Sequence, residues 1–239
     1  MKQKLAYSVD NDNPAERKRF IRGTFDAISP TYDLLNRILS FGIDMRWRRF
    51  SVNIPGDLRG KRVLDTCAGT GDSSAVLTKK GAHAVSLDFS LAMLRRGVSM
   101  GRVRYPVAAD ASCLPFREGS FSAVTVSFGI RNIPDINVYI GEVFRVLTAG
   151  GDFVILELTR PENPVVKFFY RIYLFGLIPL IGGIISGKFT AYRYLPETIA
   201  SFVDPEELRG MLEAQGFEQV RVYRKMFGVA TVLHGRKAG

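Results

Sequence analysis

The chain has 239 residues, 46 % of them hydrophobic, which suits one large domain or one domain with an insertion. Its two cysteines and two histidines argue against a disulfide framework or a metal site and favour a reducing, cytoplasmic compartment. The net charge of +10 predicts attraction to a polyanion. Because no dense Lys/Arg run or nucleic-acid-binding motif occurs, we expect an anionic membrane surface and no nucleic acid.

The N-terminal fifth of the chain is expected to be a helical cap over residues 1–50. Residues 1–19 are polar and charged, so we expect no signal peptide and a frayed end. In residues 20–50, apolar side chains recur at helical spacing, with Trp47 beyond them. They are Phe25, Ile28, Tyr32, Leu35, Ile38 and Leu39.

Strand and helix patterns alternate from Arg62 onward, which predicts a parallel sheet with right-handed crossovers over residues 51–239. Strands are expected at 62–66, 83–88, 105–109, 121–127 and 152–158, with helices near 72–80, 90–99 and 135–147. A helix near 204–215 precedes two strand-like runs, 217–224 and 227–235. Only Lys225 and Met226 separate these runs, so an antiparallel hairpin is predicted.

The segment VLDTCAGTGD, residues 63–72, is typical of the strand–loop–helix device that holds a nucleotide-like ligand. Asp65 ends the strand, and Gly69 and Gly71 allow a tight turn close to the ligand. Asp88 ends the next strand. An acid there is well placed to accept hydrogen bonds from two ribose hydroxyls.

Two ligand classes share this layout. A dinucleotide site usually has a third glycine where Ser74 stands, and leaves the helix start free for a pyrophosphate. Asp72 at the helix start would repel a pyrophosphate. Together with Asp65, it favours a phosphate-free, positively charged ligand, which predicts S-adenosylmethionine ahead of NAD.

Two further site candidates follow later strands. Asp110 and the Ala111 amide could bind an adenine ring, although Asp110 could also be an ordinary cap. Residues 126–132 close the fourth strand, where ligands bind in open α/β sheets. Packing alone explains the Arg131–Asn132 pair poorly.

Residues 165–194 interrupt the alternation with an apolar run at 172–186. The run is about five residues short of the roughly 20 needed to span a bilayer, and Pro179 and Gly182–Gly183 are expected to break it. It is either a buried helix pair that caps the sheet or a lipid-facing lid. The flanking bases favour the lid; they are Lys167, Arg171, Lys188 and Arg193.

Four strings in the chain together resemble the ubiquinone/menaquinone biosynthesis C-methyltransferases, the UbiE/MenG family, from about Phe25 to Gly235. They are YDLLNRILS at 32–40 with Trp47, SFGIRN at 127–132, the set RVL, GG and ELT between 145 and 159, and YLPETI at 194–199. The chain departs from the family pattern at Leu35 (usually Met), Asp44 (usually His), Thr148–Ala149 (usually Lys-Pro) and Thr159 (usually Ser). Asp44 excludes a histidine base at that position.

The resemblance implies an α/β fold of the Rossmann-like class I methyltransferases. This fold has seven mostly parallel strands with the last antiparallel, here with a helical N-terminal cap and an apolar insertion at about 160–200. It implies methyl transfer from S-adenosylmethionine to a ring carbon of a polyprenylated quinol. Thr70, Asp88, Asp110, Ala111 and Ser127 would line the cofactor site.

The resemblance points to Arg131 in the chemistry, assisted by Asn132 and Tyr32. The quinol carbon becomes nucleophilic when the neighbouring hydroxyl loses its proton. Because arginine stays protonated, we interpret Arg131 as a cation that holds a water and stabilises the phenolate. Tyr32 could equally be a core aromatic, and Asp33 and Trp47 are interpreted as a cap and a packing anchor.

Other functions remain open at this point. They are a different small-molecule or lipid methyltransferase, an NAD-dependent oxidoreductase, and a membrane-associated assembly subunit without activity. Ser74 and the lack of a Tyr-x-x-x-Lys pair argue against the oxidoreductase, and the intact Gly69–Asp72 loop argues against the subunit. The expected partners are the quinol and the cytoplasmic face of a membrane, and a homodimer is left open.

Overall fold

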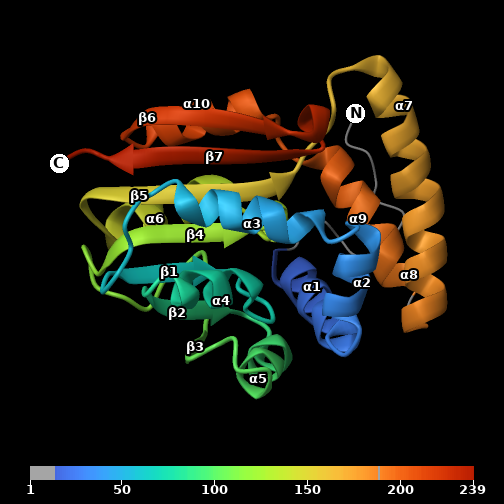
Figure 1. Ribbon diagram of the computed structural model, residues 1–239, viewed down its shortest axis with the longest axis horizontal. Helices are drawn as coiled ribbons and strands as arrows, with labels where there is room; N and C mark the ends of the chain where they lie inside the picture. Colours follow the sequence, from blue (N-terminus) through green and yellow to red (C-terminus); the bar gives the residue numbers. More distant parts are fainter. Residues whose placement is uncertain (1–13, 188) are drawn as a thin grey trace.

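The computed structural model describes residues 14–187 and 189–239, built around a seven-stranded sheet in the order β3-β2-β1-β4-β5-β7-β6 (Figure 1). Strands β1 to β5 are parallel, and β7 runs antiparallel to both β5 and β6. The expected alternation and antiparallel last strand are therefore confirmed. The strands are β1 (Arg62–Thr66), β2 (His83–Asp88), β3 (Tyr105–Ala108), β4 (Phe121–Ser127), β5 (Leu147–Leu158), β6 (Phe217–Lys225) and β7 (Ala230–Lys237).

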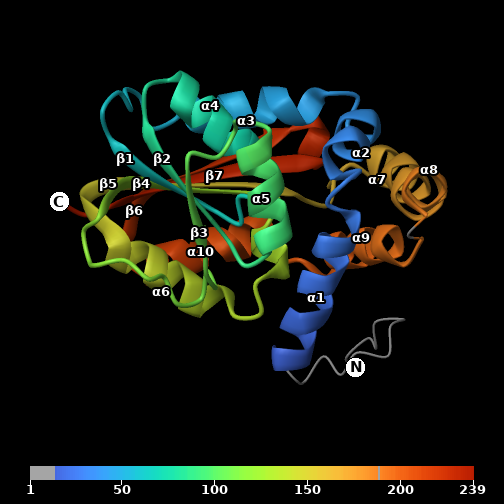
Figure 2. The same ribbon diagram turned by 90° about the horizontal axis from the view of Figure 1, so that it is seen from below.

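Helices cover both faces of the sheet (Figure 2). On one face lie α3 (Ile43–Asn53) and α4 (Asp72–Lys79); on the other lie α6 (Ile136–Val146) and α10 (Pro205–Ala214). A strand covered on both faces is buried without alternation, as β4 is, where Ser122 alone is partly exposed. Helix α5 (Leu91–Ser99) begins at the Ser90 cap, whose hydroxyl accepts from the Met93 N–H at 3.1 Å.

The remaining long helices gather beyond the carboxyl ends of the parallel strands (Figure 1). They are α1 (Pro14–Ile28), α2 (Tyr32–Leu39), α7 (Pro164–Ile172), α8 (Ile178–Ser186) and α9 (Phe189–Ser201). Their buried side chains form a second apolar cluster that includes Leu35, Ile178 and Ile199. The crevice where open α/β sheets bind ligands is therefore roofed by helices.

Three local expectations were wrong. Residues 14–19 are helical rather than frayed, since α1 begins at Pro14; residues 1–13 lie outside the described part. Strand β5 begins five residues early, because Leu147 pairs with Phe121 across a bulge. The hairpin link is longer than two residues, since a short 3-10 turn at Met226–Gly228 separates β6 from β7.

The apolar run at 172–186 lies within one continuous helical segment from Pro164 to Ser186, which Pro179 and Gly182–Gly183 do not break; α9 follows it within the insertion. A π-helical turn at Tyr173–Leu177 precedes Pro179, and this wider turn accommodates the proline without ending the helix. The segment has 23 residues, and its most apolar window of 18 residues has a mean hydropathy of 1.8 and is only 22 % buried. By length and composition it could cross a membrane, which corrects the expectation that the run is too short.

The insertion buries one narrow face. Leu174, Ile178, Gly182 and Gly183 are buried on that face. The opposite face is exposed, and its large apolar side chains are Val165, Phe168, Phe169, Ile172, Phe175, Leu177, Leu180, Ile184 and Ile185. The described part of the insertion is therefore not a buried cap. Lys167 and Arg171 are exposed beside it, whereas Lys188 and the side chain of Arg193 lie outside the described part.

Candidate functional site

The loop after β1 has the backbone of a tight turn, which a ligand can approach closely. Cys67, Gly69 and Gly71 all have positive φ, of 51°, 55° and 81°. A side chain at Gly71 would meet Val103, whose Cγ2 would lie 2.4 Å from the added Cβ. Because a positive φ strains Cys67, the tertiary structure must hold this loop in place, as is common at binding sites.

Asp88 ties this loop to the second strand. Its Oδ2 accepts from the Gly69 N–H and its Oδ1 from the Ser90 N–H, both at 2.8 Å. Each carboxylate oxygen keeps a lone pair for a further donor. Burial raises the pKa of Asp88 to about 6, partly opposed by these two N–H groups.

A hollow of about 50 Å³ opens beside Asp88 and is also lined by Asp110, Ala111 and Asn132. Its two carboxylates suit the hydroxyl and amino donors of a nucleoside, so the residues present fit an adenosine moiety. Lys18 of α1 closes over the hollow and pairs with Asp110 at 2.5 Å. An adenine amino group would therefore have to share Asp110 with Lys18.

Asp65 and Ser127 are buried next to the loop and Thr70 is buried within it, and none of the three lines the hollow beside Asp88. Asp65 is buried and accepts from Ser74 at 2.6 Å and from Thr125 at 3.2 Å. Burial raises the pKa of Asp65 to about 6. The Ser127 hydroxyl accepts from another serine, and the Thr70 hydroxyl donates to Asp33 at 2.5 Å.

The charge of Asp72 is already matched by arginines. Its carboxylate pairs with Arg37 at 2.7 Å and with Arg102 at 3.0 Å, and Arg102 also pairs with Asp33 at 3.2 Å. Burial opposes ionisation of Asp72, but nearby guanidiniums, Arg48 foremost, lower its pKa. Asp72 therefore links α4 to α2, and its charge is no argument for a cationic ligand, contrary to the expectation.

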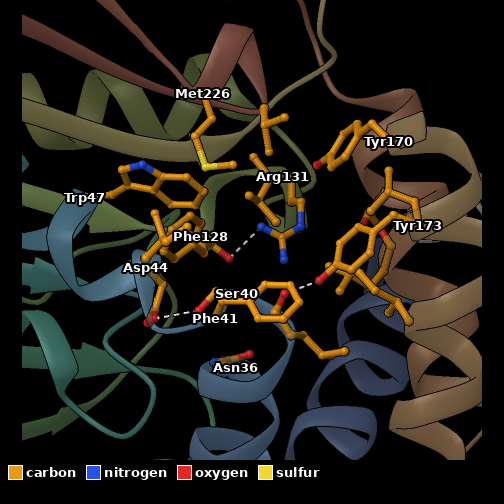
Figure 3. A pocket seen from close by; sticks show the side chains of 18 of the residues that line it. Asn36, Ser40, Phe41, Asp44, Trp47, Phe128, Arg131, Tyr170, Tyr173 and Met226 are labelled. Carbon is orange, nitrogen blue, oxygen red and sulfur yellow. Dashed lines mark hydrogen bonds between the residues drawn. The ribbon is translucent and has the colours of Figure 1, made fainter. Parts of the chain in front are cut away.

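A larger cavity of about 510 Å³ adjoins the loop, between α2, α3, the end of β4 and the helical insertion (Figure 3). Most of its wall is aromatic or aliphatic. The lining includes Phe25, Ile28, Leu39, Phe41, Trp47, Phe128, Leu158, Phe169, Tyr173, Leu174, Ile178 and Met226. Trp47 is the packing anchor that was expected, against Phe128, and it is also part of this wall.

Arg131 is the central charged group of the wall (Figure 3). Its Nη1 donates to the Phe128 carbonyl at 2.9 Å and pairs with Glu157. The Glu157 side chain is fully buried; burial raises its pKa, and the Arg131 charge partly opposes that rise. The contacts of Nη1 with Glu157 and the Phe128 carbonyl therefore hold the guanidinium in place at the cavity wall.

Tyr32 and Asn132 complete the predicted catalytic group. The Tyr32 ring lies over the cofactor loop, since a Cβ at Gly69 would be 3.9 Å from its Cε1. Burial raises the pKa of Tyr32, so its hydroxyl is neutral at physiological pH. Asn132 accepts from the Tyr194 hydroxyl at 3.1 Å and lines both the small hollow and the large cavity.

Sequence reasoning assigned no role to Glu157 and interpreted Asp33 only as a cap. Glu157 does carry a signal that could have found it, because it is an acid near the end of a buried strand, as Asp65 and Asp88 are. Nothing local points to Asp33 as the partner of Thr70, 37 residues away. Among the described residues, no group of three His, Cys, Asp or Glu is placed to hold a metal ion.

Comparisons with known proteins agree with this geometry. Residues 12–237 match the ubiE/COQ5 methyltransferase family. A demethylmenaquinone methyltransferase of Thermus thermophilus is 45 % identical over 218 residues, 88 % of this chain and 98 % of that protein. A ubiquinone/menaquinone biosynthesis C-methyltransferase of Geobacter sp. is 42 % identical over 233 residues, covering 93 % of this chain and 98 % of that protein.

Solved structures share the fold. A possible histamine N-methyltransferase of Thermotoga maritima superposes with a TM-score of 0.60 at 17 % identity, over 88 % of this chain and 98 % of that one. A phosphoethanolamine N-methyltransferase of Haemonchus contortus, in complex with S-adenosylmethionine, gives a TM-score of 0.54 at 15 % identity, over 76 % of this chain and 49 % of that one. The family match and these relatives show that this chain belongs to the ubiE/COQ5 methyltransferase family.

Proposed function

We propose that the chain methylates a ring carbon of a polyprenylated quinol. The observation that carries the proposal is that Asn132 lines both the small hollow beside Asp88 and the large apolar cavity. A methyl donor in one and an acceptor in the other would meet at this shared wall. The names of the relatives from Thermus and Geobacter support a quinone as the acceptor.

The large cavity suits a hydroxylated aromatic ring with an apolar tail. Its wall is apolar except for a few groups, Arg131 and Asn132 among them. Ligand pockets commonly combine an apolar wall with a few polar groups that fix orientation. Phe41, Phe169 and Met226 line the cavity and are also exposed, so the apolar wall continues to the molecular surface, where a long tail can leave.

In this proposal the cofactor residues are Gly69, Thr70 and Gly71 of the loop, supported by Asp65 and Ser127, with Asp88, Asp110 and Ala111 at the nucleoside. When bound, S-adenosylmethionine supplies the electrophilic methyl group.

The protein's part in the chemistry is to activate and orient the acceptor. Arg131 holds a positive charge where the quinol hydroxyl loses its proton, and so favours the phenolate. Asn132 and Tyr32 fix the ring against the cofactor loop, and the apolar wall excludes water.

The function is tested by methyl transfer from S-adenosylmethionine to short-tailed demethylmenaquinol and to the matching benzoquinol, measured by mass spectrometry of the product. We expect transfer to the reduced quinol and none to its oxidised quinone, because the quinone has no hydroxyl to ionise. Transfer to an unrelated acceptor, with neither quinol used, would overturn the proposal in favour of another small-molecule methyltransferase.

The raised pKa of Asp88 predicts a pH dependence. Cofactor affinity should rise with pH through about 6, because the ionised carboxylate is the stronger acceptor for ribose hydroxyls. Stability should move the other way. The folded-state pKa lies above the ordinary 3.8, so this contribution to stability is lost as pH rises from about 4 to about 6. Calorimetric titrations and melting curves from about pH 4 to 8 measure both effects. The pH dependence of cofactor affinity and that of stability should both be weaker in Asp88→Asn. If they are unchanged in that variant, they arise from Asp65, whose pKa is also raised to about 6.

We also propose that the exposed face of the insertion rests on an anionic membrane surface at the cytoplasmic side. Phe168, Phe175 and Ile184 are 51–68 % exposed on this face. Phe41 and Phe227, on two loops, are 80 % and 81 % exposed. Apolar surface this extensive marks an interaction site, and the net charge of +10 favours an anionic partner. A homodimer that covers the same face is the competing arrangement.

Vesicle flotation tests the membrane contact. Wild-type protein should float with anionic vesicles at low salt and be released as salt rises. Each charge of Lys167 and Arg171 should contribute about 1 kcal/mol, so Gln at both positions weakens binding. Phe168→Asp with Phe175→Asp should abolish it, whereas Val98→Asp, an exposed apolar position on α5, should leave it intact. No lipid-bound wild-type fraction at low salt would contradict the proposal.

A further inference from the structure

Tyr170 of α7 carries a buried hydroxyl with no hydrogen-bond partner. The side chain lines the large cavity, and Figure 3 shows its hydroxyl turned toward the guanidinium of Arg131. Proteins rarely leave a buried hydroxyl unpaired, since it has given up its bonds to water without replacement. Such a group at a cavity wall is therefore poised for a ligand.

A second buried donor in the same wall is also unpaired. Arg131 uses Nη1 for Phe128 and Glu157, but its Nε has no partner. The Arg131 charge acts on Tyr170 through space, where it opposes the effect of burial on the phenol's pKa. Among the described residues, the buried unpaired donors of this wall belong to Tyr170, Arg131 and Arg48. Those of Tyr170 and Arg131 lie beside each other (Figure 3), and both suit an oxygen acceptor.

Tyr173, one helical turn further on, provides the contrast. The two rings are stacked with centroids 6.4 Å apart, and both line the cavity. The Tyr173 hydroxyl, however, donates to the Leu39 carbonyl and so joins the insertion to α2. One tyrosine is thus engaged within the protein, while its neighbour is not.

We infer that the Tyr170 hydroxyl binds a ring oxygen of the acceptor and selects hydroxylated rings. The inference rests on the proposed function and adds a polar group supplied by the insertion itself. Burial keeps the pKa of Tyr170 above its ordinary value, so the phenol is a neutral donor and not a base. With Arg131 on one side and Tyr170 on the other, an acceptor without a matching oxygen would leave both donors unpaired.

The test compares Tyr170→Phe with Tyr173→Phe, which remove the same atom from neighbouring rings. In Tyr170→Phe, kcat/KM for the short-tailed quinol should fall about 10-fold, with cofactor affinity and Tm unchanged or Tm slightly higher. In Tyr173→Phe, Tm should fall, because a hydrogen bond within the protein is lost. A lower Tm in Tyr170→Phe, with kcat/KM unchanged, would overturn the inference.

Acceptor analogues sharpen the test. An analogue that keeps the reactive hydroxyl but lacks the second ring oxygen should be used about equally well by wild type and Tyr170→Phe, if Tyr170 binds that oxygen. If the loss is the same for both acceptors, Tyr170 binds the reactive oxygen, and the effect should then appear in kcat rather than KM. If wild-type protein does not methylate any quinol, the proposed function fails; if it does and Tyr170→Phe matches it on every acceptor, only this inference fails.

Discussion

Replacing Arg131 by alanine should lower the turnover of methyl transfer by roughly 10²- to 10³-fold while cofactor affinity stays near that of the wild type. The phenolate would lose the positive charge that faces it, whereas the loop that holds the cofactor is untouched. Single-turnover rates with saturating quinol measure the first effect, and calorimetry measures the second. If turnover survives and cofactor affinity falls, Arg131 belongs to the cofactor site.

The single substitution also removes the partner of Glu157, whose side chain is fully buried. Breaking a buried ion pair at one end typically costs about 3–5 kcal/mol, so Arg131→Ala should be destabilised as well as slow. The double variant Arg131→Ala/Glu157→Gln separates the two effects. It should recover much of the stability but none of the turnover. Recovery of turnover would mean that Arg131 acts only by supporting the fold.

The second large effect is expected at Asp88. Asp88→Ala should weaken cofactor binding by about 1.5–3 kcal/mol, since two ribose hydroxyls would lose a charged acceptor. The variant also frees the Gly69 and Ser90 N–H groups that Asp88 holds at 2.8 Å, so part of the loss would come from a looser loop. Calorimetry on wild type and variant gives the total.

A cofactor analogue without ribose hydroxyls separates the two contributions at Asp88. Against that analogue, Asp88→Ala should lose only the smaller part that comes from the loop. Asp57→Ala, at an exposed acid paired with Arg59 far from the loop, is the matched control and should change nothing. If Asp88→Ala loses the same affinity for S-adenosylmethionine and for the analogue, Asp88 does not bind the ribose hydroxyls.

The fold was predictable because its signals are local. The pattern of apolar residues that predicts each strand and each helix lies within a run of neighbouring residues. The Gly69–Gly71 turn lies between one such strand, β1, and one such helix, α4. Asp88, Asp110 and Arg131 could be named because strand ends in a parallel sheet meet at one edge. Element boundaries were less accurate where pairing decides them, as at the early start of β5.

What the sequence did not reveal depends on partners far apart in the chain. Asp72 was interpreted as a free charge because Arg37 and Arg102 are brought to it only by the fold. Glu157 meets Arg131 across 26 residues. Pro179 was expected to end a helix, but the π-helical turn before it absorbs the distortion. At Asp72 the tertiary structure overrides a correct local rule, whereas at Pro179 the neighbouring turn does so.

The shared wall at Asn132 has a thermodynamic consequence. A residue that borders two ligands, with Tyr32 over the cofactor loop beside it, makes each ligand part of the other's environment. Any factor by which quinol tightens S-adenosylmethionine binding must equal the factor by which S-adenosylmethionine tightens quinol binding. An affinity measured for one ligand alone is therefore one of four affinities in a closed cycle, and any three of them fix the fourth.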